Sequence, residues 1–335
     1  MISKFFVIFL SYVNIFSFLN GKTDYIFLQN QISDLYSKKN DAVIRVLRTV
    51  DPKKIDYRDL STGFFIDNLG HVLTSNSDFE KSGDFFILFN RKTYESNIIG
   101  FDKVTGLGLL KLLDPPEKFS FIQVFPETKV PRTGSLAIAI TQKLDLSGFP
   151  RISRNPVAYP RLSTVMGNIP NLFPFFRMDL KLFIGERGSP IFDLHGSFIG
   201  SICKSIGDVE ESLILPSFAI DRIIRDLKVS GKVNYGWIGL DISTNANGEI
   251  YIKDISSDSP LATLDVQKND LILSLGDYKI NNYRDYSRAL FYSRPDSKLK
   301  VILKRGLETK TFLISLKSRP ILKNSQNESK SIQRK

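Results

Sequence analysis

Short runs of β-branched and aromatic residues, separated by turn residues, fill the first half of the chain. The runs that show this pattern are DAVIRVLRT, STGFFIDNLGHVLTS, DFFILFN, SNIIGFD, LGLLKLL and SLAIAIT. Closely spaced short strands of this kind are typical of an all-β barrel or sandwich. The stretch FFIDNLGHVLT predicts a hairpin with Asn-Leu-Gly-His at its turn. The first half of the chain is therefore expected to be a β protein.

The pattern changes twice in the middle of the chain. From about residue 125 to 176, Pro, Gly and Arg stand among isolated apolar residues, which predicts long surface loops. The stretch LILPSFAIDRIIRDLKVSG then predicts an amphipathic helix that ends at Gly231. Its apolar face consists of Ile220, Ile223, Ile224 and Leu227. A domain is expected to end there.

The two ends of the chain differ from the rest. An apolar run from Phe5 to Leu19 follows Lys4, and this pattern favours an export signal over residues 1–20. An uncleaved anchor or a core helix is the alternative. The tail at 319–335 is basic and almost free of apolar residues, so it is expected to be disordered. The protein is therefore expected to be exported, to a periplasm or the cell envelope.

Charge and cysteine content narrow the classes of function. The net charge is +11, but the 46 basic residues are interleaved with 35 acidic ones. No zinc-binding spacing or P-loop accompanies them, so neither nucleic-acid binding nor a metal or other cofactor is expected. Contact with anionic envelope surfaces explains the charge better. The single cysteine, Cys203, cannot form an intrachain disulfide and is expected to be a buried thiol.

Five stretches follow, in order, the landmarks of a known family: STGFFIDNLGHVLTSNSDF, IIGFDKVTGLGLLKL, MDLKLFIGERGSPIFDLHGSFIGSI, LILPSFAI and YGWIGL. On these stretches the chain resembles the HtrA family of exported trypsin-like serine proteases. The resemblance implies a mostly β fold, in which a trypsin- or chymotrypsin-like double β-barrel precedes an α+β PDZ domain. It implies an N-terminal segment at 21–40, a trypsin-like domain at 41–230 and a PDZ domain at 231–318.

A serine protease needs a hydroxyl nucleophile, an imidazole base and a carboxylate that orients the base. By resemblance, the histidine, aspartate and serine positions are Ser77, Gly106 and Arg187. The oxyanion loop would be Gly185, Glu186 and Arg187, whose backbone amides do not depend on the missing side chains. On this basis the chain is expected not to be an enzyme.

Other residues could replace the missing groups. Ser189 lies two residues after Arg187, and Lys181 is the nearest lysine, so a Ser-Lys pair is one alternative. The two histidines, His71 and His195, are expected to be exposed turn residues. Arg187 is expected to pair with Glu186 or Asp78, to bind a carboxylate of a partner, or to be exposed on a relaxed loop.

The PDZ resemblance implies a peptide-binding site. In this mode, backbone amides hold a C-terminal carboxylate while the peptide adds a strand to the edge of the sheet. The implied residues are Ile238, Gly239, Leu240, Ile242, Tyr286, Ala289 and Leu290. The alternative is that the apolar members of this set are simply core. Asp265 and Asn269 occupy glycine positions of the family, and both residue types tolerate positive φ.

These observations lead to one expectation and one alternative. The chain is expected to be an HtrA-like pseudoprotease that binds proteins or peptide C-termini, as a regulatory subunit, chaperone or scaffold in envelope protein quality control. The alternative is an active serine-type endopeptidase with a non-standard site. The resemblance also implies homo- or hetero-trimers, with an active relative as one possible partner. The segment YIFLQNQISDLY could supply apolar contacts for them or could equally pack on its own barrel.

Overall fold

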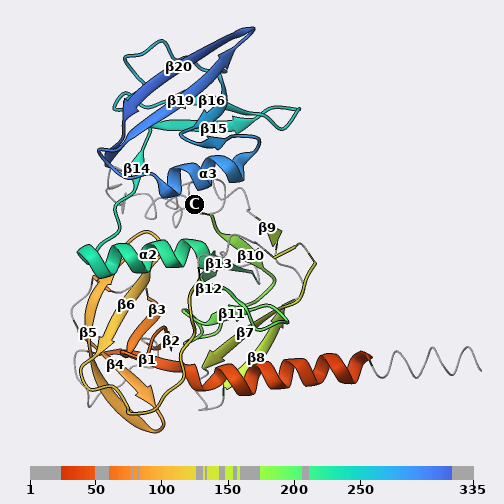
Figure 1. The fold of residues 1–335 in the computed structure, drawn as a ribbon, viewed down its shortest axis with the longest axis vertical. Coiled ribbons are helices and arrows are strands. Elements are labelled where there is room, and N and C mark those ends of the chain that lie inside the picture. Colours follow the sequence, from red (N-terminus) through yellow and green to blue (C-terminus); the bar gives the residue numbers. More distant parts are fainter. Residues whose placement is uncertain are drawn as a thin grey trace, which may run out of the picture. The chain divides into compact units, whose positions relative to one another are not determined.

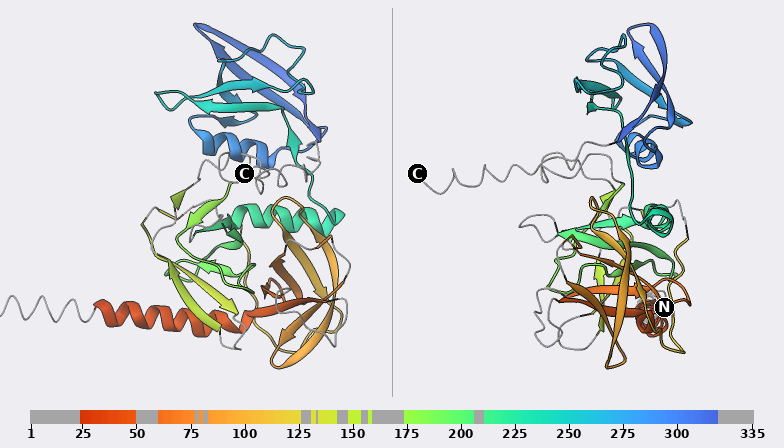
Figure 2. Two further views of the ribbon diagram at one scale, coloured as in Figure 1. Left: turned by 180° about the vertical axis from the view of Figure 1, so that it is seen from behind. Right: turned by 90° about the vertical axis from the view of Figure 1, so that its left-hand side faces the viewer.

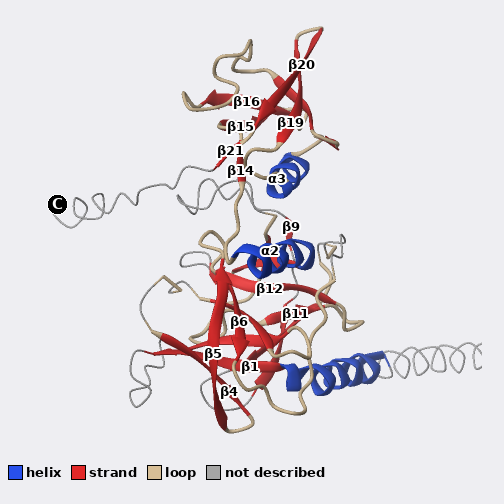
Figure 3. Ribbon diagram, turned by 60° about the vertical axis from the view of Figure 1, so that its left-hand side comes forward, coloured by secondary structure: helices blue, strands red, loops and turns tan. Residues whose placement is uncertain are grey.

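The computed structural model describes most of the chain between residues 24 and 318. The ranges left out are 1–23, 50–59, 77–78, 81–82, 126–130, 133, 143–147, 154–156, 159–173, 206–210 and 319–335. The predicted export signal, the basic tail, Ser77 and Asp78 lie outside the described residues. The chain divides into two compact units, the first ending at Gly231 and the second resuming at Lys232. Strands outnumber helices in both (Figures 1 and 3), as the pattern predicted for the first half of the chain.

Six antiparallel strands of the first unit close into a barrel in the order β1-β2-β3-β6-β5-β4. They are β1 (Val43–Thr49), β2 (Leu60–Phe65), β3 (His71–Ser75), β4 (Asp84–Phe89), β5 (Lys92–Phe101) and β6 (Leu107–Leu112). Their apolar side chains, among them Phe65, Val72, Phe85 and Leu110, fill the barrel. The predicted hairpin is confirmed as β2 and β3, with Gly70 at φ 83° in its turn.

The hairpin turn is held by one carboxylate. An oxygen of Asp67 accepts hydrogen bonds from the amides of Leu69 and His71, and the carboxylate also binds His71 Nδ1 at 2.7 Å. Lys228, from the last turn of the helix α2 (Ser217–Ser230), binds Asp67 at 3.1 Å. His71 is therefore half-buried and paired, and the expectation that it is an exposed turn residue is wrong for this histidine.

The second sheet of the first unit has seven strands in the order β8-β7-β11-β12-β13-β10-β9. They are β7 (Ala137–Gln142), β8 (Gly148–Ser153), β9 (Val157–Ala158), β10 (Phe176–Met178), β11 (Pro190–Phe192), β12 (Phe198–Ser205) and β13 (Ser212–Pro216). Strands β8 and β9 correct the expectation of long loops in this stretch. Pro150 breaks the strand pattern in the sequence, but β8 lies at the sheet edge, where a missing N–H is tolerated.

Two helices belong to the first unit. The helix α2 buries Ile220, Ile223, Ile224 and Leu227 and ends at Gly231 with φ 70°, as predicted. Each such apolar side chain contributes about 1.5–3 kcal/mol on burial. Residues 24–39 form a helix (red in Figure 2) that leads through the 3-10 turn η1 (Asn40–Ala42) into β1. None of the helices in the described residues is both long and apolar enough to cross a membrane.

The described residues of the second unit form a main sheet, a separate pair of short strands and one helix. A sheet of β15 (Leu240–Thr244), β16 (Ile250–Ile255), β17 (Leu271–Leu275), β19 (Lys298–Arg305) and β20 (Glu308–Ser315) follows that order, and β18 (Tyr278–Lys279) joins β17. A separate pair joins β14 (Gly236–Trp237) to β21 (Lys317–Ser318). The helix α3 (Tyr283–Tyr292) begins at Asn282, whose side chain accepts the amide of Asp285.

The two glycine positions of the family that carry Asp and Asn here differ in structure. Asn269 adopts φ 72°, as its position requires. Asp265 does not need positive φ and instead binds Arg305 at 2.8 Å and Lys310. Arg305 also binds Asp270 at 2.7 Å. Hydrogen bonds from Lys310 and Arg305 lower the pKa of Asp265 to about 2.

Candidate functional site

The loop between β10 and β11 carries the predicted oxyanion residues, and three hydrogen bonds fix it to the first barrel and β12. The amide of Thr62 donates to the Arg187 carbonyl at 2.7 Å, and its hydroxyl donates to the Gly185 carbonyl at 2.7 Å. The amide of Gly188 donates to the Ile202 carbonyl at 2.8 Å. Thr62, which the sequence reasoning missed, therefore holds this loop from β2.

The structure brings together the neighbourhoods of the three predicted triad positions. The amide of Asn76, the residue before Ser77, donates to the carbonyl of Gly106 at 2.9 Å. A Cβ atom on Gly188 would lie 2.1 Å from the Thr62 carbonyl oxygen and 2.7 Å from the Ser75 nitrogen. Only glycine allows this approach, and its φ of 82° agrees with that requirement.

The loop keeps two backbone donors unused. Among the described residues, the amides of Gly185 and Arg187 have no acceptor. The buried carboxylate of Glu186 stays inside the loop, where it accepts the Thr141 hydroxyl at 3.2 Å and the Phe183 amide at 2.9 Å. In the described part of the chain no ion pair joins Glu186 to Arg187, so pairing with Asp78, binding of a partner's carboxylate and an exposed arginine stay as the alternatives for Arg187.

The candidate replacement groups are not arranged as a catalytic pair. The Ser189 hydroxyl is buried and donates to the Glu186 carbonyl at 2.7 Å. His195 is an exposed turn residue, as expected, and Lys181 is also exposed. Across the residues that the structure describes, no hydrogen bond joins Ser189 to a lysine or a histidine. A nucleophilic role for Ser189 would require the loop to open.

A second basic side chain lies against the loop between β5 and β6. The Nζ atom of Lys204, on β12, is 3.4 Å from the Val104 carbonyl oxygen. The register of β12 with β13 shifts at Cys203, and such bulges redirect side chains. Burial lowers the pKa of Lys204, and the charge of Arg187 also lowers it, whereas Cys203 and Asp102 act in the opposite direction. The amide of Gly188 donates to the Ile202 carbonyl, so the loop that carries Arg187 lies beside the strand that carries Lys204.

Cys203 itself is a buried free thiol, as predicted. Burial raises its pKa to about 12. A thiolate is the reactive form of cysteine, so this residue is inert at neutral pH.

In the second unit, the predicted carboxylate-binding loop is fixed by a serine that the sequence reasoning did not single out. The Ser259 hydroxyl donates to the Ile238 carbonyl at 2.6 Å and accepts the amide of Leu261 at 3.0 Å. Gly239 adopts φ 72°, and a Cβ atom there would lie 2.7 Å from the Cβ of Ser259. The only sequence signal for Ser259 was the Ser-Pro pair of the family run.

Strand β15 lies at the edge of its sheet and presents backbone groups for a further strand. The amide of Ser256 donates to the Gly239 carbonyl, so Leu240 occupies a non-hydrogen-bonded position opposite β16. The amide of Ile252 donates to the Asp270 carbonyl, and its carbonyl accepts the amide of Asn269. Ile252 therefore makes its backbone hydrogen bonds on the side away from β15, and Ile242, which lies opposite it, is also in a non-hydrogen-bonded position. In an antiparallel pair, such residues direct N–H and C=O away from the partner strand. Leu240 and Ile242 therefore direct theirs to the free edge.

The predicted lining residues lie deeper than the backbone edge. Ile238, Ile242, Tyr286, Ala289 and Leu290 are all buried in one apolar cluster, and Leu240 is partly buried against it. Their side chains thus form the core beneath the edge, and Leu240 alone of the set keeps a partly exposed side chain.

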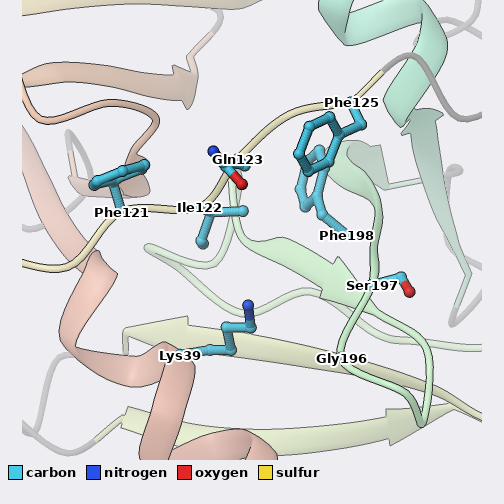
Figure 4. A pocket seen from close by; sticks show the side chains of 8 residues that line it. All are labelled: Lys39, Phe121, Ile122, Gln123, Phe125, Gly196, Ser197 and Phe198. Atoms are coloured by element: carbon cyan, nitrogen blue, oxygen red, sulfur yellow. The ribbon is translucent and has the colours of Figure 1, made fainter.

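A pocket of 430 Å³ in the first unit lies beside the residues that join the N-terminal helix to the barrel (Figure 4). Its lining is Lys39, Phe121, Ile122, Gln123, Phe125, Gly196, Ser197 and Phe198. None of these residues belongs to the predicted oxyanion loop or to the predicted triad positions, so this pocket is not part of the predicted catalytic site.

Comparisons with known proteins agree with this architecture. Residues 61–200 match the trypsin-like peptidase domain family, and residues 236–316 match the PDZ domain family. The HtrA-type protease AlgW with tripeptide superposes with a TM-score of 0.69 at 17% identity, covering 87% of this chain and 98% of that chain. The serine endoprotease from Yersinia pestis gives 0.61 at 18% identity, covering 86% and 98%.

Curated relatives point the same way. A probable periplasmic serine endoprotease DegP-like of Bartonella henselae is 24% identical over 80% of this chain and 55% of its own length. The serine endoprotease DegS of Haemophilus influenzae is 23% identical over 76% of both chains. The chain spans about half the length of the DegP-like relatives. It therefore combines a trypsin-like domain with a PDZ domain. Its fold and domain order agree with the resemblance to the HtrA-type proteases, and the periplasmic names of its relatives agree with the predicted export.

The comparisons contradict the prediction that the chain is not an enzyme. The relatives that align over about four fifths of it are named serine endoproteases. The prediction was drawn from residue identities at three aligned positions. Changes at these three positions would remove one catalytic arrangement, but they would not exclude catalysis by other groups.

Proposed function

We propose that this protein acts on exported polypeptides in the periplasm and captures their C-termini through its PDZ domain. The observation that carries the proposal is the free edge of β15. There, Leu240 and Ile242 offer backbone N–H and C=O groups two residues apart, as strand addition requires. The amides of the preceding loop, at Ile238, Gly239 and Leu240, would hold the terminal carboxylate. Capture of this kind suits a chaperone, a scaffold or a subunit that regulates a relative.

A peptide-binding measurement on the full chain tests this proposal. A dye-labelled peptide with an apolar, free C-terminus is titrated with protein and compared with its C-terminally amidated form. Amidation is expected to weaken binding about tenfold or more, because it removes the charge that the loop amides would hold. Equal affinity for the two peptides in the wild-type protein would contradict the proposal.

A second function is favoured by the names of the relatives, namely serine-type endopeptidase activity at a non-standard site. The unused amides of Gly185 and Arg187 support it, since an oxyanion hole consists of such donors. The nucleophile would come from a group other than residue 187.

Turnover of casein by repurified protein tests the second function. The activity is expected to survive repurification and to fall when Pro replaces Arg187, because proline removes the second amide donor. Ser189→Ala distinguishes the Ser189 alternative from other nucleophiles. No turnover above a buffer control would contradict this function and would leave the PDZ proposal standing.

We further propose that the protein assembles as a homo- or hetero-trimer through its trypsin-like unit. The helix over residues 24–39 supports this, because it exposes Tyr25, Ile26 and Phe27 to 67%, 49% and 63%. Light scattering after gel filtration is expected to give a mass above the monomer that falls in Tyr25→Ser with Phe27→Ser. A monomeric wild type would contradict it.

A further inference from the structure

Two basic side chains lie at the place where a triad is predicted. Arg187 stands at the serine position, and the ammonium of Lys204 lies against the loop that contains Gly106, the aspartate position. Both side chains are partly exposed. In the described part of the chain, neither cation forms an ion pair with a carboxylate.

The acidic side chains near this place already accept hydrogen bonds from neighbouring groups. The carboxylate of Asp102 is buried and accepts both the amide and the hydroxyl of Thr105, at 3.3 and 2.6 Å. The carboxylate of Glu186 is buried and accepts hydrogen bonds from the Thr141 hydroxyl and the Phe183 amide. Asp102 favours the charged form of Lys204 through its negative charge. Within the described residues, however, neither carboxylate forms an ion pair with Arg187 or Lys204, so both cations keep donors for a carboxylate from outside.

The remaining groups on the loop suit the same kind of ligand. The amides of Gly185 and Arg187 add two donors that have no described acceptor. Directly before them, Phe183 and Ile184 are 51% and 55% exposed and offer apolar contact. A guanidinium matches a carboxylate with two parallel hydrogen bonds, and an ammonium supplies a further point charge.

We infer that the surface around Arg187 and Lys204 is a second peptide-binding site, which holds a peptide carboxylate next to an apolar side chain. This site belongs to the trypsin-like unit, differs from the PDZ loop and does not depend on turnover. The carboxylate is either a free C-terminus or an Asp or Glu side chain, because both present the same two oxygens.

The experiment separates the two sites by using the full chain with Gly239→Val, which removes the loop geometry of the PDZ site. Three dye-labelled apolar peptides are titrated: one with a free C-terminus, one amidated with an internal Glu, and one amidated with Gln instead. At least one carboxylate peptide is expected to bind this variant, and the Gln peptide about tenfold more weakly or not at all. The better carboxylate peptide identifies the source.

Adding Arg187→Gln or Lys204→Gln to Gly239→Val is expected to reduce this binding at least about tenfold. Lys92→Gln, an exposed lysine on β5, changes the net charge equally and is expected to leave it unchanged. Arg187→Lys keeps the charge and is expected to retain part of the affinity, which guards against a folding defect. The inference is overturned if the Arg187→Gln and Lys204→Gln variants bind as well as Gly239→Val alone, or if Gly239→Val alone abolishes all binding. Loss of peptide binding at the PDZ loop does not count against the inference.

Discussion

The oxyanion loop of the trypsin-like unit and the carboxylate loop of the PDZ unit are both glycine turns whose backbone amides are their working groups. In the first, Gly106 and Arg187 occupy two of the positions predicted for a catalytic triad. In the second, no side chain of the loop has a chemical task, and Ser259 only fixes its shape. A function that depends on the backbone needs a conformation, whereas a triad needs three particular side chains. The first kind tolerates sequence change far better.

The largest effect is expected where a glycine is packed against backbone. Gly188→Val would place its Cβ 2.1 Å from the Thr62 carbonyl oxygen at a φ of 82°, so the loop must move. We expect a loss of about 3 kcal/mol or more in the free energy of unfolding. Thermal or urea unfolding measures it. Gly134→Ala, at φ 86° with no atom within 4 Å, is the matched control and should cost only about 1–2 kcal/mol. Equal losses would show that the packing around Gly188 is not decisive.

The next effect concerns peptide affinity in the PDZ unit. Gly239→Val puts a side chain against Ser259 and distorts the loop, so affinity for a free C-terminus should fall about 100-fold. Arg187→Gln should leave this PDZ affinity unchanged, because the two loops belong to different units. Peptide titrations on both variants measure this. A Gly239→Val protein with wild-type affinity would show that peptide binding does not depend on the backbone conformation of the PDZ loop.

A smaller effect is expected from the residue that fixes the PDZ loop. Ser259→Ala removes the hydrogen bond to the Ile238 carbonyl and the acceptor of the Leu261 amide, in a buried place. We expect about 1–3 kcal/mol less stability and a several-fold weaker peptide affinity. Ser297→Ala removes an exposed local bond and serves as the control. A Ser259→Ala protein that binds as well as the wild type would show that the loop holds its shape without this bond.

The smallest effect is a difference between the two units on acidification. Burial lowers the pKa of His71 against the opposing effect of Asp67, so the neutral form is favoured in the folded state. The unfolded chain binds the proton more readily, so the first unit should lose stability as the pH falls below about 6.5. In the second unit, the pKa of Asp265 is lowered to about 2, so the ionised carboxylate favours the folded state. This contribution to stability is lost only when the pH falls below the usual pKa range of aspartate.

Thermal unfolding between pH 7 and 5 measures this difference. His71→Gln should remove the loss from the first unit, and His195→Gln, at an exposed turn, should not. If both units change alike over this range, or if His71→Gln changes nothing, the assignment to His71 is wrong.

The sequence predicted backbone features better than side-chain partners. The β2–β3 hairpin, the apolar face of α2 and its end at Gly231 follow from local patterns of apolar and glycine residues. The strand β8 was missed because its pairing with β7 is set by tertiary contact and its own sequence contains Pro150. Three hydrogen bonds join residues far apart in the chain: Lys204 with Val104, Thr62 with Gly185, and Ser259 with Ile238. No local sequence pattern predicts such pairs.

The most direct test of the account is amide hydrogen exchange of the full chain with and without an apolar peptide. The account predicts that a free C-terminus slows exchange at the amides of Leu240 and Ile242, on the free edge of β15, and that the amidated peptide does not. Unchanged exchange at these two amides with a saturating free C-terminus would contradict it.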